Sequence, residues 1–204
     1  ASERTLDEFV AEVAKIPLQF DPGTVWNYSI STDIIGAIIQ RIEGKPLGQV
    51  FEERLFKPLG MVDTHFRVPD SKMDRIADCY AFHPKDKMEL FDYGDGSRWT
   101  RDGRMESGGG GLASTLSDYH KFCRMLVNGG AIVDEAGNFV QIISPKTLEL
   151  MTANHLPGNK DLTQLSQSLF SEAENAGVGF GLGFACNMNP AMTMLPGSAG
   201  EFYW

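Results

Sequence analysis

The stretch from residue 21 to residue 66 limits the possible folds more than any other part of the chain. It opens with the turn sequence Asp21-Pro22-Gly23, in which proline fixes φ and glycine supplies a permissive position. A helix is expected to follow, with Ser31 or Thr32 as its cap, because isoleucines recur behind them at helical spacing. These isoleucines are Ile34, Ile35, Ile38, Ile39 and Ile42.

Tyr28 lies between this turn and this helix. A helix entry can hold a polar side chain rigidly while its tip stays free. Gly44 is the expected end of the helix. A second helix is predicted from about 47 to 56, with Pro58 as its stop and residues 59–61 as a tight apolar turn.

Further helices and strands are predicted from their periodicity. Short helices are expected to begin at Thr5, with Pro17 as the stop, and at Ser144-Pro145, where proline takes the first helical position. Another spans about 117–127, with Thr115 and Asp118 at capping-box spacing. Strands are predicted at 78–82 and 88–92, around residues 83–86.

Glycines alternate with bulky residues from Gly177 to Phe184, which predicts one strand with a bare face that a neighbouring backbone approaches closely. Residues 154–176 are polar and predict a long surface loop. Helices in the middle and a sheet late in the chain indicate an α+β fold.

Composition sets loose limits. A chain of 204 residues forms one domain or two small ones, and its net charge of -9 disfavours nucleic acid and anionic membranes as partners. No run approaches the roughly 20 apolar residues of a transmembrane helix. Its first residues lack an initiator Met and a signal-peptide pattern, and its last residues form an aromatic run, so we expect a fragment.

The cysteines and histidines are scattered along the chain. The cysteines predict reduced, buried thiols rather than disulfides, and neither set has the spacing of a zinc site. We expect no metal and no organic cofactor. The sequence does not determine the compartment, although it slightly favours the cytoplasm. It does not determine the oligomeric state. The residues concerned are Cys79, Cys123, Cys186, His65, His83, His120 and His155.

The ordered series PGTVWNYS, isoleucine helix, GKPL and KPLGMVDTHF resembles the serine β-lactamase and penicillin-binding-protein superfamily. The similarity is strongest to class C β-lactamase relatives and family VIII carboxylesterases. It continues through later segments and covers nearly the whole chain. The resemblance implies a β-lactamase/transpeptidase-like fold, mainly the helical domain with part of the flanking antiparallel sheet. The later segments are 107–112, 144–148, 154–157 and 181–184.

This resemblance divides the chain into four regions of one partial hydrolase domain. Residues 1–66 are a helical region that holds the catalytic tyrosine, and 75–100 are an insertion of strands and loops. Residues 107–153 are a second helical region, and 177–204 begin the C-terminal sheet.

By resemblance, Tyr28 is the catalytic tyrosine that acts with an S-x-x-K serine and lysine. A free phenol has a pKa of about 10, so a value near 7 needs about 4 kcal/mol of added phenolate stabilisation, which an adjacent ammonium supplies. No serine lies three residues before any lysine of this chain, and no G-x-S-x-G is present. The expected nucleophile is therefore upstream of Ala1.

Two more residues bear on the substrate. Trp204 resembles the first residue of the W-G-G motif of family VIII esterases, although a plain strand aromatic is an equal reading. Ile30 stands where class C β-lactamases and peptidases usually carry an asparagine that binds the substrate amide. An isoleucine makes no such hydrogen bond, which favours simple esters.

The chain lacks the K-T-G motif as well, since Lys146-Thr147 is followed by leucine at a helix start. The glycine run 107–111 is expected to be a turn rather than a phosphate cradle, because no Gly-Lys-Ser/Thr follows it. The resemblance thus predicts a serine hydrolase of small esters, inactive as this fragment. A β-lactamase, a D-amino-acid peptidase and a non-catalytic binding homologue remain as alternatives.

Overall fold

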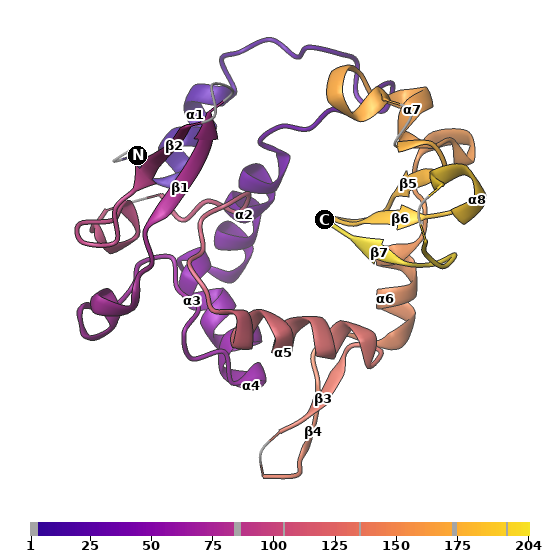
Figure 1. Cartoon of the computed structure of the whole chain (residues 1–204). Coiled ribbons are helices and arrows are strands. Elements are labelled where there is room, and N and C mark those ends of the chain that lie inside the picture. The colour runs from indigo at the N-terminus through magenta and orange to yellow at the C-terminus, as the bar shows by residue number, and fades with distance from the viewer. Residues whose placement is uncertain (1–3, 84–86, 104, 135, 173–174, 195) are drawn as a thin grey trace. The chain divides into compact units, whose positions relative to one another are not determined.

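The computed structural model describes residues 4–83, 87–103, 105–134, 136–172, 175–194 and 196–204 (Figure 1). The chain divides into two compact units. The first comprises residues 1–16, 30–124 and 133–140, and the second comprises 17–29, 125–132 and 141–204.

The first unit is built around three helices, α1 (Leu6–Val13), α2 (Ser31–Glu43) and α3 (Leu47–Phe51). Helix α1 begins directly after Thr5, as the sequence predicts, although it ends four residues before Pro17. Thr5 caps it in a reciprocal capping box with Glu8. The buried centre of this core is formed by Leu6, Ala37 and Leu47.

The isoleucine period correctly predicts α2, but the buried apolar positions of this helix are small residues, with half-buried Ile39 packed against the same core. Gly36 lies so close to Leu47 that an added Cβ would sit 3.0 Å from its Cδ2 atom, while Ile35, Ile38 and Ile42 are exposed. The predicted cap is wrong: the helix already includes Ser31, and Ile30 precedes it without a side-chain hydrogen bond. Gly44 ends α2 in the left-handed conformation, as expected.

The second predicted helix runs on past its expected stop at Pro58. A π-helical turn (Glu52–Phe56) follows α3 and leads into α4 (Lys57–Leu59), in which Pro58 occupies the first turn. Since proline has no N–H, this continuous helical run has no backbone donor at position 58. The helix ends at Gly60, where the Met61 N–H donates to the Phe56 carbonyl and the Gly60 N–H to that of Lys57.

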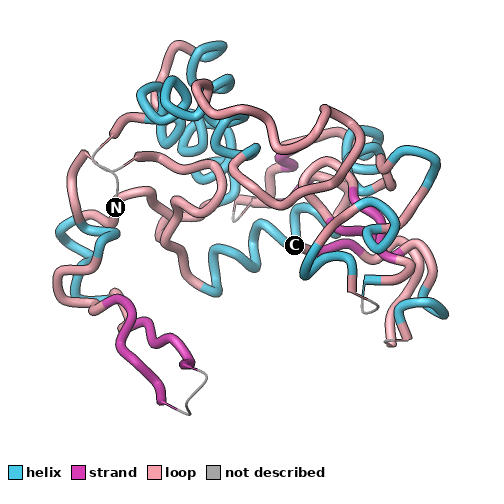
Figure 2. The backbone as a smooth tube through the Cα atoms, turned by 90° about the horizontal axis from the view of Figure 1, so that it is seen from above, coloured by secondary structure: helices cyan, strands magenta, loops and turns pink. Residues whose placement is uncertain are grey.

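The two predicted strands are present as β1 (Cys79–His83) and β2 (Lys87–Asp92). They pair in an antiparallel hairpin, seen as two long magenta strands in Figure 2. Residues 84–86 of the predicted connection lie outside the described residues. Helix α5 (Leu116–Val127) follows, and the Thr115 hydroxyl accepts from the Asp118 N–H. The prediction that all cysteines are buried is wrong, because Cys79 is exposed on β1 and Cys123 is half-buried.

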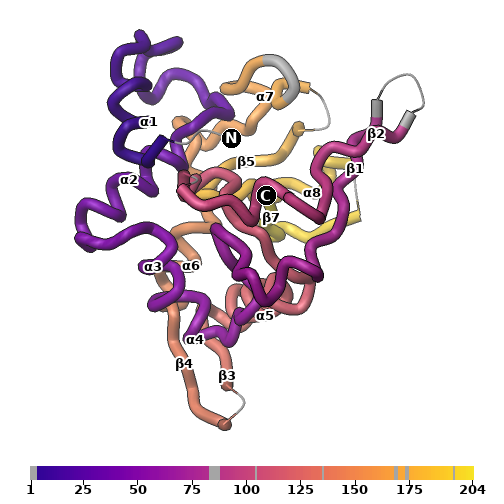
Figure 3. The backbone as a smooth tube through the Cα atoms, turned by 90° about the vertical axis from the view of Figure 1, so that its left-hand side faces the viewer, coloured from indigo at the N-terminus to yellow at the C-terminus, as the bar shows by residue number. Residues whose placement is uncertain are grey.

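The second unit contains a three-stranded antiparallel sheet in the order β5-β6-β7 (Figure 1). Its outer strands, β5 and β7, are also labelled in Figure 3. The remaining elements of the chain include β3 paired with β4 and several short helices. The sheet strands are β5 (Val178–Phe180), β6 (Ala185–Asn187) and β7 (Phe202–Tyr203). The others are β3 (Ala131–Val133), β4 (Phe139–Gln141), α6 (Pro145–Thr152), α7 (Leu162–Leu165) and α8 (Pro190–Thr193), with 3-10 turns at Asp70–Arg75, Arg98–Thr100, Pro157–Asn159 and Ser168–Ser171.

The glycine-striped segment is a hairpin rather than the single predicted strand. The Gly181 N–H donates to the Phe184 carbonyl across a two-residue turn in which Gly183 has a φ of 91°. The predicted close approach is confirmed, because a Cβ on Gly181 would lie 2.1 Å from the Met151 carbonyl oxygen. Gly181 therefore permits a close backbone contact, and Gly183 permits the turn of the hairpin.

The predicted long surface loop at 154–176 is also wrong in part. It contains α7, whose Leu162 is fully buried with Val178 and Ala185 in the core of this unit. Asp161 caps that short helix in a capping box with Gln164. Polar composition hid the helix because it is short and its single buried leucine produces no periodicity. No helix among the described residues is both long enough and apolar enough to cross a membrane.

Replacing Gly181 with alanine is expected to lower the free energy of unfolding by about 1–3 kcal/mol, because the methyl group would overlap a backbone oxygen. Gly110→Ala is the matched control, since nothing lies within 4 Å of its Cβ position, and it should change stability by less than about 0.5 kcal/mol. Urea denaturation of both variants measures the difference. Equal stabilities would contradict the close packing at Gly181.

Candidate active site

A tight turn begins the segment that carries Tyr28. The Thr24 N–H and hydroxyl both donate to the Asp21 carbonyl, at 3.2 and 2.7 Å. Gly23 between them has a φ of 81°, which suits the third residue of a type II turn after Pro22. The predicted turn is confirmed, and it directs the chain toward the sheet of the second unit.

Trp26 anchors this segment to that sheet. Its N–H donates to the Leu165 carbonyl at 2.9 Å, which ties the segment to the end of α7. Its ring packs against the core of Leu162, Val178 and Ala185. Backbone and ring together fix the chain two residues before Tyr28.

Five rings gather where this segment meets the sheet, and we call them the aromatic cluster: Trp26, Tyr28, Phe170, Phe180 and Trp204. The ring of Tyr28 stacks on Phe170 with centroids 5.6 Å apart and lies 5.8 Å from that of Trp204. Trp204 in turn packs edge-on against Phe180 at 4.8 Å. Such distances are typical of attractive aromatic pairs.

Two residues of the cluster remain more than half exposed. Tyr28 is 60% exposed and Trp204 is 52% exposed. Among the described residues of this unit, none forms a hydrogen bond with the Tyr28 hydroxyl. A phenol held by its ring faces, with its oxygen free, is able to exchange a proton with a bound molecule beside it.

The structure therefore brings together two of the three residues singled out from the sequence. Ile30 belongs to the first unit, where it is half-buried immediately before α2. Sequence reasoning missed Phe170, which lies in the polar segment taken for a loop. The signal available there was an isolated aromatic residue in polar sequence.

Asp161 precedes α7, the helix whose last carbonyl accepts the hydrogen bond from Trp26. Its buried carboxylate accepts from the Gly177 N–H at 2.9 Å and from the Thr163 hydroxyl at 2.6 Å, linking α7 to the start of β5. Burial alone would raise the pKa of this carboxyl, but these hydrogen bonds outweigh it and hold the pKa below its usual value.

The glycine run lies in the first unit, at the start of α2. The Ser107 hydroxyl donates to Asp33 Oδ1 at 2.5 Å, and a Cβ on Gly108 would lie 2.3 Å from the Thr32 carbonyl oxygen. The prediction of a turn holds, because the glycines permit this close approach to a helix. The run receives no further role in the site.

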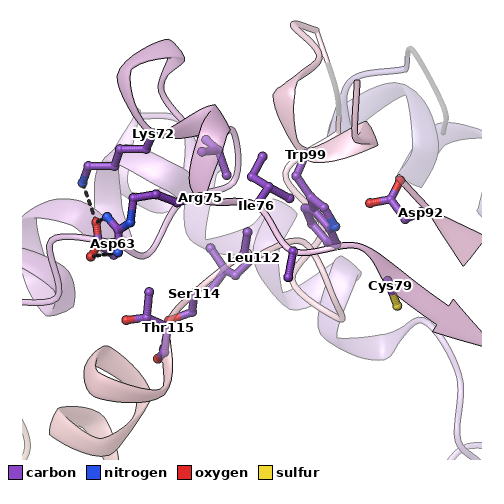
Figure 4. A pocket seen from close by; sticks show the side chains of 13 residues that line it. Asp63, Lys72, Arg75, Ile76, Cys79, Asp92, Trp99, Leu112, Ser114 and Thr115 are labelled. Carbon is purple, nitrogen blue, oxygen red and sulfur yellow. Dashed lines mark hydrogen bonds and ion pairs between the residues drawn. The ribbon is translucent and has the colours of Figure 1, made fainter. Parts of the chain in front are cut away.

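A cavity of about 330 Å³ lies elsewhere in the first unit and has a charged end (Figure 4). There Arg75 donates two hydrogen bonds to Asp63, and Lys72 pairs with the same carboxylate at 2.8 Å. The hydrogen bonds from Arg75 and then Lys72 hold the pKa of Asp63 far below its usual value. Because these charges satisfy one another, we assign them a bracing role.

The part of the chain that the structure describes contains no group of three or more His, Cys, Asp or Glu side chains that could hold a metal ion. The candidate site therefore consists of the tyrosine hydroxyl, the exposed indole of Trp204 and the rings that hold them.

The chain is similar to known proteins over nearly its whole length. The family model described as Beta-lactamase matches residues 1–202. The chain belongs to the beta-lactamase family. This confirms the family and the α+β, β-lactamase/transpeptidase-like fold predicted from the sequence.

Individual members of the family include several that are described as hydrolases. The chain is 32% identical over 201 residues to a protein of Mycobacterium tuberculosis, covering 97% of this chain and 47% of that protein. It is 33% identical over 137 residues to the lovastatin esterase of Penicillium rubens, covering 66% of this chain and 34% of the esterase.

The solved structure of EstCE1, a hydrolase with promiscuous acyltransferase activity, matches with a TM-score of 0.76 and 25% identity. The match covers 98% of this chain and 50% of EstCE1. The chain thus spans about half the length of the first curated relatives it matches, and 47% of the Mycobacterium tuberculosis protein.

Asp161→Asn should lower the free energy of unfolding at neutral pH by about 1–2 kcal/mol, because a charge-assisted cap becomes a neutral one. The folded pKa is depressed, so the carboxylate stabilises fully above its unfolded value of about 3.9 and loses this effect as pH falls through the folded value. The gap between wild type and variant should therefore narrow toward about pH 2. Urea denaturation followed by tryptophan fluorescence at both pH values measures it.

Asp95→Asn is the control, because Asp95 is exposed in a loop of the first unit. It should leave both transitions unchanged. A gap for Asp161→Asn that stays constant between the two pH values would contradict the assigned role of the carboxylate.

Proposed function

We propose that the full-length protein is a serine hydrolase that cleaves small carboxylic esters through an acyl-serine intermediate. Within it, Tyr28 is the catalytic base and Trp204 contacts the substrate. The proposal needs no metal ion and no organic cofactor. It rests on membership of the beta-lactamase family and on one observation: Tyr28 is largely exposed within the aromatic cluster, and no described residue of its unit bonds with its hydroxyl.

The geometry of the cluster suits this role. Stacking on Phe170 and the contact with Trp204 restrict the Tyr28 ring without occupying its oxygen. A catalytic base must lie within hydrogen-bond distance of the proton that it takes. Packing that restricts the ring reduces the conformational entropy lost in reaching that position. The exposed indole of Trp204 offers an apolar wall to the acyl or alcohol part of an ester.

The nucleophile is a separate part of the proposal. None of the lysines in these 204 residues follows a serine by three positions. We therefore assign the S-x-x-K serine and lysine to the portion of the relatives' length that this chain does not span. The lysine ammonium would supply the phenolate stabilisation that an isolated phenol lacks.

The proposed reaction proceeds in two steps. The serine oxygen attacks the ester carbonyl while Tyr28 takes its proton, and Tyr28 returns that proton to the departing alkoxide. Water then attacks the acyl-serine while Tyr28 takes a proton from it. As the bond between the acyl carbon and the serine oxygen breaks, Tyr28 gives this proton to the serine oxygen, which releases the acid and regenerates the free serine. No oxidant or further reactant is required.

Esters are favoured over β-lactams and peptides by Ile30. This half-buried residue makes no side-chain hydrogen bond at the start of α2, and an isoleucine cannot bind a substrate amide there. A site that lacks this hydrogen-bonding group loses little when the substrate has no amide. The description of two relatives as an esterase and as a hydrolase with acyltransferase activity agrees with this choice.

In the full-length protein, Tyr28→Phe should lower kcat/KM for p-nitrophenyl butyrate by about 10²- to 10⁴-fold, because the ring and its packing remain while the proton carrier is lost. Tyr93→Phe is the control, since Tyr93 is an exposed tyrosine of the first unit, and it should leave the rate unchanged. The 204-residue chain by itself should give no turnover. Turnover by this chain that survives Tyr28→Phe would overturn the assignment.

Ile30→Asn should raise the ratio of nitrocefin to p-nitrophenyl butyrate turnover by about tenfold, because an amide group becomes available to the lactam amide. Ile42→Asn places the same change at a position of α2 that is 76% exposed, and it should leave the ratio unchanged. If wild type already prefers nitrocefin, the ester assignment fails even where the Tyr28 prediction holds.

A further inference from the structure

The first unit contains a second cavity, of about 430 Å³, that the proposed hydrolysis does not use. Side chains of the π-helical turn, of α5 and of the segments between them form its wall. The lining residues are Phe51, Leu55, Phe56, Met61, Thr64, Leu112, Ser114, Tyr119 and Phe122. Its size falls in the range of small-molecule pockets.

The wall carries no charged side chain, and its two aliphatic hydroxyls are already paired. The Thr64 and Ser114 hydroxyl oxygens lie 2.8 Å apart, and Thr64 also donates to Asp118 Oδ2 at 3.1 Å. A carboxylate or an ammonium placed inside would lose its water without gaining a partner, which costs several kcal/mol. The chemistry of the wall therefore selects a neutral, apolar occupant.

The elements that surround the cavity are joined by specific hydrogen bonds. Leu55 and Phe56 come from the π-helical turn, a rare geometry that is frequent at functional sites. Buried Asp118 binds the Asp63 N–H at 2.6 Å, and Lys121 on the next turn of α5 donates to the Gly60 carbonyl. These bonds join α5 to the end of the helix that carries the π turn.

The mouth of the cavity also suits an apolar guest. Tyr119 stacks on Phe122 with centroids 6.2 Å apart and remains 54% exposed. No described residue bonds with its hydroxyl. A guest with a neutral polar end could place its hydrocarbon part in the cavity and its polar end beside Tyr119.

We propose that this cavity is a binding site for a neutral molecule with an alkyl or aryl group, such as a fatty alcohol or an uncharged lipid ester. The proposal rests on the wall of this cavity alone and does not depend on the hydrolase assignment. An apolar pocket of this size gains affinity from the area it removes from water.

The test uses the neutral fluorophore N-phenyl-1-naphthylamine with the purified 204-residue chain. Its fluorescence should rise on binding, and Leu55→Trp, which fills the cavity, should weaken binding at least tenfold. Leu150→Trp places the same change at an exposed position of α6 and should leave binding unchanged. Equal binding by all three proteins would overturn the proposal, because the dye would then lie on exposed apolar surface.

A second pair of variants guards against misfolding of Leu55→Trp. Tyr119→Ala removes an exposed rim residue and should weaken binding several-fold, whereas Tyr80→Ala, an exposed tyrosine of β1, should not. The opposite pattern would move the site to the β1–β2 hairpin and refute the assignment to the cavity.

Competition then tests the chemical class. At pH 8, 1-decanol should displace the dye at a concentration at least tenfold lower than decanoate does, because the wall offers nothing to a carboxylate. Displacement by decanoate at an equal or lower concentration would contradict a neutral ligand.

Discussion

The anchoring of Trp26 is the interaction on which the candidate site depends. One backbone hydrogen bond to Leu165 and the burial of the indole against the core fix a loop that has no regular structure of its own. Every other ring of the aromatic cluster is either on this loop or packed beside it. Since Tyr28 follows two residues later, the packing of one tryptophan sets where the phenol lies.

Much of this arrangement could be predicted from local sequence. The Pro22-Gly23 turn, the helix start at Thr5 and the glycine that ends α2 all depend on neighbouring residues alone, and each is present. Tyr28 can be singled out as a candidate because its motif is contiguous. These features share a short range, so their physical cause is written within a few residues.

The sequence-based predictions are wrong or incomplete where the structure depends on contacts between residues far apart in the chain. The isoleucine stripe of α2 predicts a helix, yet the core is made through Gly36 and Ala37 because Leu47 approaches there. The glycine stripe gives no indication that it folds back at Gly183. Phe170 joins Tyr28 across more than a hundred residues of sequence, and no periodicity reports such a contact.

The two proposed activities belong to different units and use opposite chemistry. In the aromatic cluster, no described residue of the same unit bonds with the hydroxyl of the largely exposed Tyr28, whereas the two aliphatic hydroxyls of the cavity, those of Thr64 and Ser114, are paired with each other. The central claim is that the aromatic cluster belongs to the active site of a serine hydrolase. Intact-mass analysis of the full-length protein during p-nitrophenyl butyrate turnover tests it most directly, with peptide mapping of the acylated residue. The account predicts one butyryl group on a serine outside these 204 residues; a butyrylated serine within them, or ester consumption with no acyl-protein formed, would contradict it.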